Sequence, residues 1–136
     1  MFDILNLKLK GKSMENINFD YINSFLTQYL LSLGFIPKHS GFTFIKQCVH
    51  EGIKNNGVLG SLSKQVYPAV AKLNNSNAVN VERNIRNSIS YAKRSWKNCS
   101  DVDNVFFRLG NVSNRNFLAF LVDQVLIAQM QMVQIV

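Results

Sequence analysis

The chain has 136 residues, of which 47% are apolar and 11% aromatic, a composition that excludes wholesale disorder and allows one domain with a sizeable core. Its formal net charge is +7, and most of the excess lies in residues 64–97, where Glu82 is the single acid among seven Lys and Arg side chains. Such a concentration is typical of proteins that bind nucleic-acid phosphate, with an anionic membrane surface as the second candidate. RNA is disfavoured because the Gly-rich and aromatic motifs of the common RNA-binding modules are missing.

Residues 1–15 form an N-terminal arm whose structure the sequence leaves open. Leu5, Leu7 and Leu9 alternate with polar residues, which is the period of a strand. An edge strand, a basic tail that contacts DNA and a segment without a role are equally compatible with this pattern. The arm lacks the long apolar core and the cleavage site of a signal peptide, so we expect a cytoplasmic protein. Residues 16–136 are expected to be a single helical domain.

Two helices are predicted before the basic region. Asn18 or Asp20 should start the first, and Gly34 should end it. Ser40 should cap the second, which should end near Gly57. The apolar residues of both recur at helical spacing and predict core packing: Ile22, Phe25, Leu26, Tyr29, Leu30 and Leu33 in the first, and Phe42, Ile45, Cys48, Val49 and Ile53 in the second.

Residues 67–95 are predicted to form a helix-turn-helix. The first helix, residues 67–73, has Pro68 in its first turn, where a missing backbone N–H costs nothing. Residues 74–77, with the sequence NNSN, should form the turn, because Asn is the non-glycine residue that best tolerates the left-handed conformation.

The second helix of this motif has one apolar side and one polar, basic side. Its apolar side is formed by residues at three- and four-residue steps: Ala78, Val81, Ile85, Ile89, Ala92 and Trp96. Ser76 or Asn77 should cap it, so the polar residues begin in the first turns, where a recognition helix meets base edges. Arg can contact guanine, Asn can contact adenine and Glu can accept from cytosine.

This pattern leads to an explicit set of predicted DNA contacts. Base reading is assigned to Asn80, Glu82, Arg83, Arg86 and Asn87. Phosphate contact is assigned to Ser61, Lys64, Lys72, Ser90, Lys93 and Arg94. An ordinary amphipathic surface helix shows the same periodicity, so the pattern alone leaves DNA binding and simple solvation equally open.

The runs LGSLSKQVYPAVAKL and VERNIRNSISYA together resemble the C-terminal DNA-binding domain of the stage-zero sporulation protein A family of response regulators. The similarity covers residues 34–96, including GFIPKHSGFTFIKQCV, and resumes at residues 116–123, NFLAFLVD. The resemblance implies a bundle of six helices that binds short boxes of the TGTCGAA type, often in tandem, to activate or repress transcription. Glu82, Arg83 and Arg86 fall on the family's VER-x-IR run, whose Glu and first Arg contact bases.

Three departures limit what this resemblance implies. Asn80 stands where the family usually has an Arg that helps to read the box, so we expect a different base preference. The family's phosphate-accepting receiver domain does not occur in the 136 residues, and the expectation is a stand-alone effector domain without a phosphorylation switch. Residues 97–112 differ from the segment that the family uses against RNA polymerase sigma factor, which leaves a polymerase contact, and with it activation, open.

Residues 117–136 contain one charged side chain, Asp123, and are long enough to cross a bilayer. Five polar side chains argue against insertion, and an Asp near the middle alone costs about 3 kcal/mol. We therefore expect a buried terminal helix, continued after Ala128 by a strand or by a helix with an apolar seam. Exposed apolar groups at this end predict self-association, with a homodimer on tandem sites, through Met130, Met132, Val133 and Ile135.

Neither enzyme activity nor a cofactor is expected. Cys48 and Cys99 are too few for a zinc site, and Cys48 should fill core instead. His39 and His50 have no carboxylate or Cys at ligand spacing, and no phosphate-binding Gly loop occurs.

The sequence thus predicts an all-α, compact bundle of about five or six helices that contains a helix-turn-helix. The predicted function is that of a bacterial, cytoplasmic transcription regulator that binds double-stranded DNA. The alternative is a protein-interaction module that binds or antagonises the full-length sporulation regulator or RNA polymerase.

Overall fold

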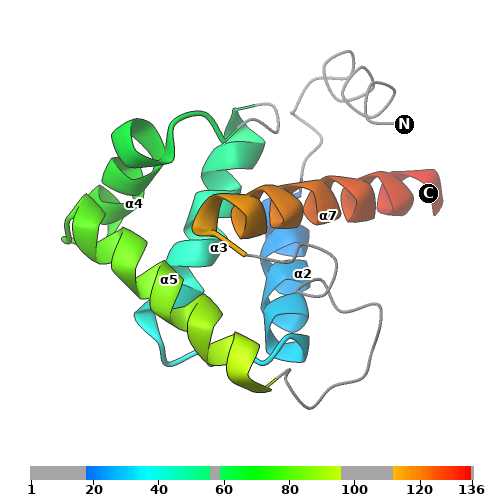
Figure 1. Ribbon diagram of the computed structural model, residues 1–136. Helices are drawn as coiled ribbons and strands as arrows, with labels where there is room; N and C mark the ends of the chain where they lie inside the picture. Colours follow the sequence, from blue (N-terminus) through cyan, green and yellow to red (C-terminus); the bar gives the residue numbers. More distant parts are fainter. Residues whose placement is uncertain (1–17, 56–58, 96–111, 136) are drawn as a thin grey trace.

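The computed structural model describes residues 18–55, 59–95 and 112–135. These residues form five α-helices and one π-helical turn without any strand, which confirms the all-α prediction (Figure 1). The predictions for residues 1–15, for Trp96 and for Cys99 fall outside the described residues.

Helix α2 (Phe19–Ser32) begins and ends as the sequence predicts. The side chain of Asn18 accepts a hydrogen bond from the backbone N–H of Tyr21 at 3.0 Å, so Asn18 is the N-cap. Gly34 has a φ of 88°, a left-handed conformation that a residue with a Cβ adopts only with strain. The helix is therefore fixed at both ends by residues readable from the sequence.

Helix α3 (Ser40–Lys54) is the centre of the bundle and packs against α2, α4, α5 and α7 (Figure 1). The apolar residues predicted for it, Phe42, Ile45, Cys48, Val49 and Ile53, are all buried. Burial, with the charge of Glu51 as a second cause, raises the pKa of the Cys48 thiol to about 12. The thiol is therefore neutral and packs as a small apolar group, as expected.

The start of α3 differs from the prediction by one residue. Ser40 is the first helical residue rather than the cap, and His39 holds the cap position without a side-chain hydrogen bond to the helix. The backbone gives the reason, because the N–H of His39 donates to the carbonyl of Ile36 at 3.1 Å and its carbonyl accepts from the N–H of Phe42 at 3.0 Å. This turn brings the chain into the helix one residue early. At its other end α3 stops before Gly57, which lies outside the described residues.

Helix α7 (Asn114–Ile135) completes the core by crossing α2 and α3 (Figure 1). Phe117 is fully buried, and its ring stacks on that of Phe35 with 5.3 Å between the ring centroids. The rings of Tyr29 on α2 and Phe120 on α7 also meet, with 6.3 Å between their centroids. These aromatic contacts hold α7 against the first two helices.

The residues of α7 after Ala128 continue the helix, so the strand alternative for this segment is wrong. Buried side chains keep a helical spacing across this point, at Val125, Leu126 and Gln129, whereas a strand would alternate them. None of the helices in the described ranges combines the length and the apolar character that crossing a bilayer requires.

Candidate nucleic-acid interface

A π-helical turn, η2 (Leu62–Val66), leads into α4 (Tyr67–Leu73). In this turn the N–H of Val66 donates to the carbonyl of Ser61 at 3.2 Å, across five residues. Pro68 follows, and its ring excludes the carbonyl four residues earlier from an ordinary helical position, which accounts for the wider turn. The prediction that Pro68 lies in the first turn of α4 is confirmed, whereas the π-turn before it was not predicted.

The turn between α4 and α5 (Ala78–Ser95) has the predicted chemistry. Asn75 adopts a φ of 51°, in the left-handed region that Asn tolerates. Of the two expected caps, Asn77 rather than Ser76 holds α5, because its side chain accepts a hydrogen bond from the backbone N–H of Asn80 at 2.8 Å. This bond satisfies a backbone N–H in the first turn of α5 that would otherwise lack a partner within the helix.

The apolar side of α5 packs against the core. A Cβ added to Gly41 of α3 would overlap the Oγ of Ser88 and the backbone carbonyl of Asn84, so the two helices cross in close contact. Ser88 is only 4% exposed at this crossing. The predicted apolar residues in the described part of α5 lie against the core: Ala78 partly buried, and Val81, Ile85, Ile89 and Ala92 fully buried. The opposite side of α5 is consequently left to solvent.

This opposite side carries most of the predicted DNA contacts. The exposed ones on α5 are Arg83, Arg86, Asn87, Ser90, Lys93 and Arg94. Asn80 and Glu82 are half-buried. Lys72 is exposed in the last turn of α4, Lys64 is exposed on η2 and Ser61 is half-buried before it. One helix face therefore gathers the base-reading candidates with half of the phosphate candidates, and the other half lies on the preceding elements.

Asn80 is held by a local hydrogen-bond cluster. Its Nδ2 donates to the Oγ of Ser76 at 2.8 Å, and its Oδ1 accepts from Asn84 at 2.9 Å and from a guanidinium nitrogen of Arg83 at 3.1 Å. Both ends of the amide are thus engaged within the domain. The contact to Arg83 orients the guanidinium and still leaves it donors for a base edge.

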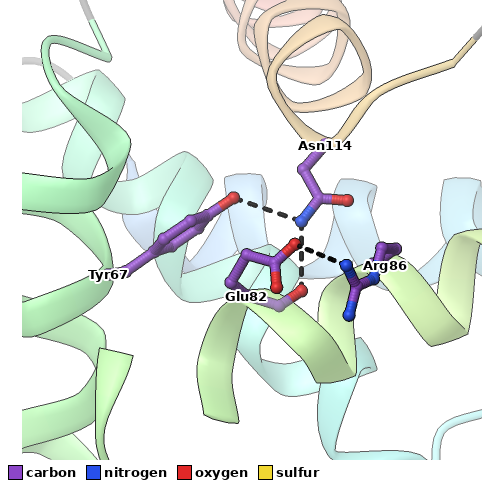
Figure 2. A network of polar contacts seen from close by, with 4 residues as sticks. All are labelled: Tyr67, Glu82, Arg86 and Asn114. Carbon is purple, nitrogen blue, oxygen red and sulfur yellow. Dashed lines mark hydrogen bonds and ion pairs between the residues drawn. The ribbon is translucent and has the colours of Figure 1, made fainter. Parts of the chain in front are cut away.

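Glu82, in the second turn of α5, lies close to the start of α7 (Figure 2). Its carboxylate is 3.5 Å from a guanidinium nitrogen of Arg86, one turn later on α5. The Nδ2 of Asn114, in the first turn of α7, donates to the backbone carbonyl of Glu82 at 3.1 Å and to the hydroxyl of Tyr67 on α4 at 3.2 Å. Asn114 therefore ties α4 and α5 to α7.

Ser61 has a structural task in the turn that precedes α4. Its hydroxyl accepts from the backbone N–H of Lys64 at 3.3 Å, and its own N–H donates to the side-chain carbonyl of Gln65 at 3.3 Å. This reciprocal arrangement caps η2. Nearby, a guanidinium nitrogen of Arg115 donates to the carbonyl of Gly60 at 3.1 Å, which attaches this turn to α7.

A cleft of about 350 Å³ opens beside the exposed face of α5, where the start of α3 meets it. Two of its lining residues, His39 and Tyr91, meet edge to face, with 5.1 Å between the ring centroids. Eight residues line the cleft, and none is acidic: His39, Ser40, Asn84, Asn87, Ser88, Ser90, Tyr91 and Arg94. Hydroxyl, amide and guanidinium donors of this kind suit phosphate oxygens.

Sequence reasoning missed the residues that position this surface. Asn84 holds the side chain of Asn80, and Asn114 holds the backbone carbonyl of Glu82 from a distant helix; the sequence pattern identified neither residue. His39 and Ser40 reach the surface from a separate helix and were equally hidden.

The structure thus contains a short helix, a tight turn and a second helix. One side of the second helix packs on the core, and its opposite side is basic. This arrangement defines a helix-turn-helix domain of the DNA-binding class. Residues 26–125 match the family model described as the C terminal of the sporulation initiation factor Spo0A, and the chain belongs to this family. The matched region starts in α2 and ends in α7, so every described helix takes part in it. This is a family of DNA-binding effector domains of a sporulation regulator rather than of enzymes.

Proposed function

We propose that this domain regulates transcription by placing α5 in the major groove of a short DNA box. The observation that carries the proposal is the row of exposed groups Arg83, Arg86 and Asn87 on a helix whose other side is locked to the core. The major groove admits one α-helix, and its base edges present the acceptors and donors that these groups pair with. Occupancy of a promoter by such a domain is enough for repression.

We assign two of the proposed base-reading residues to particular bases. Arg83 is assigned to guanine, since two guanidinium donors match O6 and N7, and Glu82 is assigned to the amino group of cytosine. Arg86 and Asn87 complete the reading face, and the ion pair of Arg86 with Glu82 limits the freedom of both side chains before DNA arrives.

The proposed phosphate contacts surround these readers. Ser90, Lys93 and Arg94 come from the second half of α5, and Lys72 comes from the end of α4. Ser61 and Lys64 come from the π-turn and its cap. The acid-free cleft next to Arg94 supports this assignment, because it offers several donors to one anionic oxygen.

The direct test compares two arginines of α5. Arg83→Ala should weaken binding to a TGTCGAA duplex by about 1–3 kcal/mol and weaken binding to a scrambled duplex much less. Arg94→Ala is the matched control, since a phosphate contact should be lost equally on both duplexes and the dependence of log K on log salt should become shallower by about 0.9. Fluorescence anisotropy across a salt series measures both.

Two results would contradict the proposal. Equal losses of Arg83→Ala on both duplexes would reduce Arg83 to a phosphate contact. Absence of any salt-dependent duplex binding by the wild-type chain, together with capture of the full-length regulator or RNA polymerase in a pull-down, would favour the protein-interaction function instead.

Self-association through the end of α7 is a further part of the proposal. The helix runs to Ile135, so the apolar residues predicted for this role, Met130, Met132, Val133 and Ile135, stand on one regular helix. Linking two domains gives the second box a high effective concentration of protein. Inverted boxes imply an isologous two-fold pair, and direct repeats imply a head-to-tail pair.

Light scattering of the full chain and of a chain ending at Ala128, each with and without tandem-box DNA, tests the pairing. Circular dichroism verifies that the shortened chain keeps its helices. The full chain should form dimers on tandem boxes and the shortened chain should not. If both stay monomeric and fill tandem boxes independently, the end of α7 has no part in pairing.

A further inference from the structure

Val79 is the most exposed large apolar side chain among the described residues, at 70% of its full area. It is the second residue of α5, directly after the capped start of the helix. Single apolar residues on a surface are ordinary, so exposure alone indicates no role. The place of Val79 on α5 is what gives it meaning.

Val79 lies on the reading face and not at the margin of the core. Arg83 and Arg86 follow it by four and seven residues, a spacing that places all three on one side of a helix. The buried side of α5 includes Ala78, which is partly buried, and Val81, which is fully inaccessible, and Val79 lies away from both. An apolar group therefore stands in line with two guanidinium groups, in the turn that enters a groove first.

The fold itself gives no reason for a valine here. The side chain buries little, and a β-branched residue is a poorer helix former than alanine at an exposed helical position. The chemistry of the major groove supplies a reason, because the C5 methyl group of thymine is the apolar feature of its base edges. TGTCGAA-type boxes carry thymines on both strands, so a recognition helix meets such methyl groups.

We propose that Val79 determines sequence specificity by packing against the C5 methyl group of one thymine in the box. This inference rests on the proposed DNA-binding function and adds an apolar contact to the polar readers. It predicts that one A·T pair of the box is recognised through its methyl group, next to the base pairs that Arg83 reads.

Uracil tests this contact, since it pairs as thymine does and lacks only the methyl group. A set of duplexes carries one TGTCGAA box in which each thymine is replaced by uracil in turn. At one position uracil should weaken binding of the wild-type chain about fourfold, the equivalent of one buried methyl group. Val79→Ala should bind the unmodified box about fourfold more weakly and should be insensitive to uracil at that position.

Leu73→Ala is the matched control. Leu73 is the last residue of α4 and is 64% exposed, so its replacement removes a comparable apolar area outside α5. This variant should keep the uracil sensitivity of the wild type. Thermal melting checks that Val79→Ala is folded, which its exposure and the higher helix propensity of alanine lead us to expect.

The inference is overturned if no uracil substitution weakens the wild-type chain, or if uracil weakens the wild type and Val79→Ala equally at every position. In both cases discrimination between the TGTCGAA duplex and a scrambled duplex would survive, and the proposed function would stand. Loss of that discrimination in the wild type overturns the function and this inference together.

Discussion

Replacing Gly41 by alanine should loosen the packing of α5 against α3. Gly41 lies in the first turn of α3, where that helix crosses α5. The new Cβ would overlap the Oγ and Cβ of Ser88 and the backbone carbonyl of Asn84. A hydroxyl can rotate away, but a carbonyl inside a helix cannot move alone, so relief requires the whole of α5 to shift.

Two opposing effects determine how much Gly41→Ala lowers the free energy of unfolding. Overpacking of this kind typically costs about 1–3 kcal/mol, and the contact with backbone places Gly41→Ala toward the upper part of that range. The lower conformational entropy of the unfolded chain returns about 0.4–1 kcal/mol. We therefore expect a net loss of about 1–2 kcal/mol in the free energy of unfolding, with a melting temperature lower by several degrees.

Gly52→Ala in the same helix is the matched control for this experiment. A Cβ at Gly52 would meet only side-chain carbons, Leu59 Cδ2 at 3.0 Å and Val122 Cγ2 at 3.1 Å, and these can give way. Urea unfolding should show a clearly smaller loss for Gly52→Ala, and box affinity should fall only in Gly41→Ala, because only that change displaces α5. Equal stability of the two variants would refute the reasoning from the α3–α5 contact.

Two more predictions concern base preference and pH. Selection from randomised duplexes should return a site that differs from TGTCGAA at one end, and Asn80→Arg should restore the family's base there; a wild-type site identical to TGTCGAA would exclude any such role for Asn80. Desolvation raises the pKa of Asp123 above its ordinary value of 3.8, so its protonated form favours the folded state and this stability is lost as the pH rises through the raised pKa. Asp123→Asn should therefore unfold at higher urea concentration than the wild type at neutral pH. This gain in stability should vanish below about pH 3.8. A gain of the same size at every pH would show that ionisation of this carboxyl is not its cause.

The elements of this fold were largely predictable because their signals are local. The stripe of α5, the proline of α4 and the left-handed Asn75 depend on residues within a few positions of one another, and each was found in the structure as expected. The π-turn was missed because the effect of Pro68 falls on the residues before it, where the sequence looks like ordinary helix.

The sequence predicted which residues belong to the candidate site better than it predicted how they are arranged. Periodicity alone separates the exposed face of α5 from its buried face, so the residues of that face could be named in advance. The contact of Gly41 with Ser88 and the bonds of Asn114 join residues far apart in the chain, and no local pattern encodes them. Self-association and the individual base contacts stay predictions.

The hydrogen bonds of Asn114 form a bridge that joins the start of α7 to α4 and α5. One amide nitrogen donates to the hydroxyl of Tyr67 on α4 and to the carbonyl of Glu82 on α5 (Figure 2). A displacement of the start of α7 would therefore stretch or break its hydrogen bonds to both helices. If the proposed DNA binding favours this bridged arrangement, a molecule that binds α7 and favours the same arrangement would tighten DNA binding, and DNA would tighten its binding by the same factor. A partner that breaks the bridge would then weaken DNA binding.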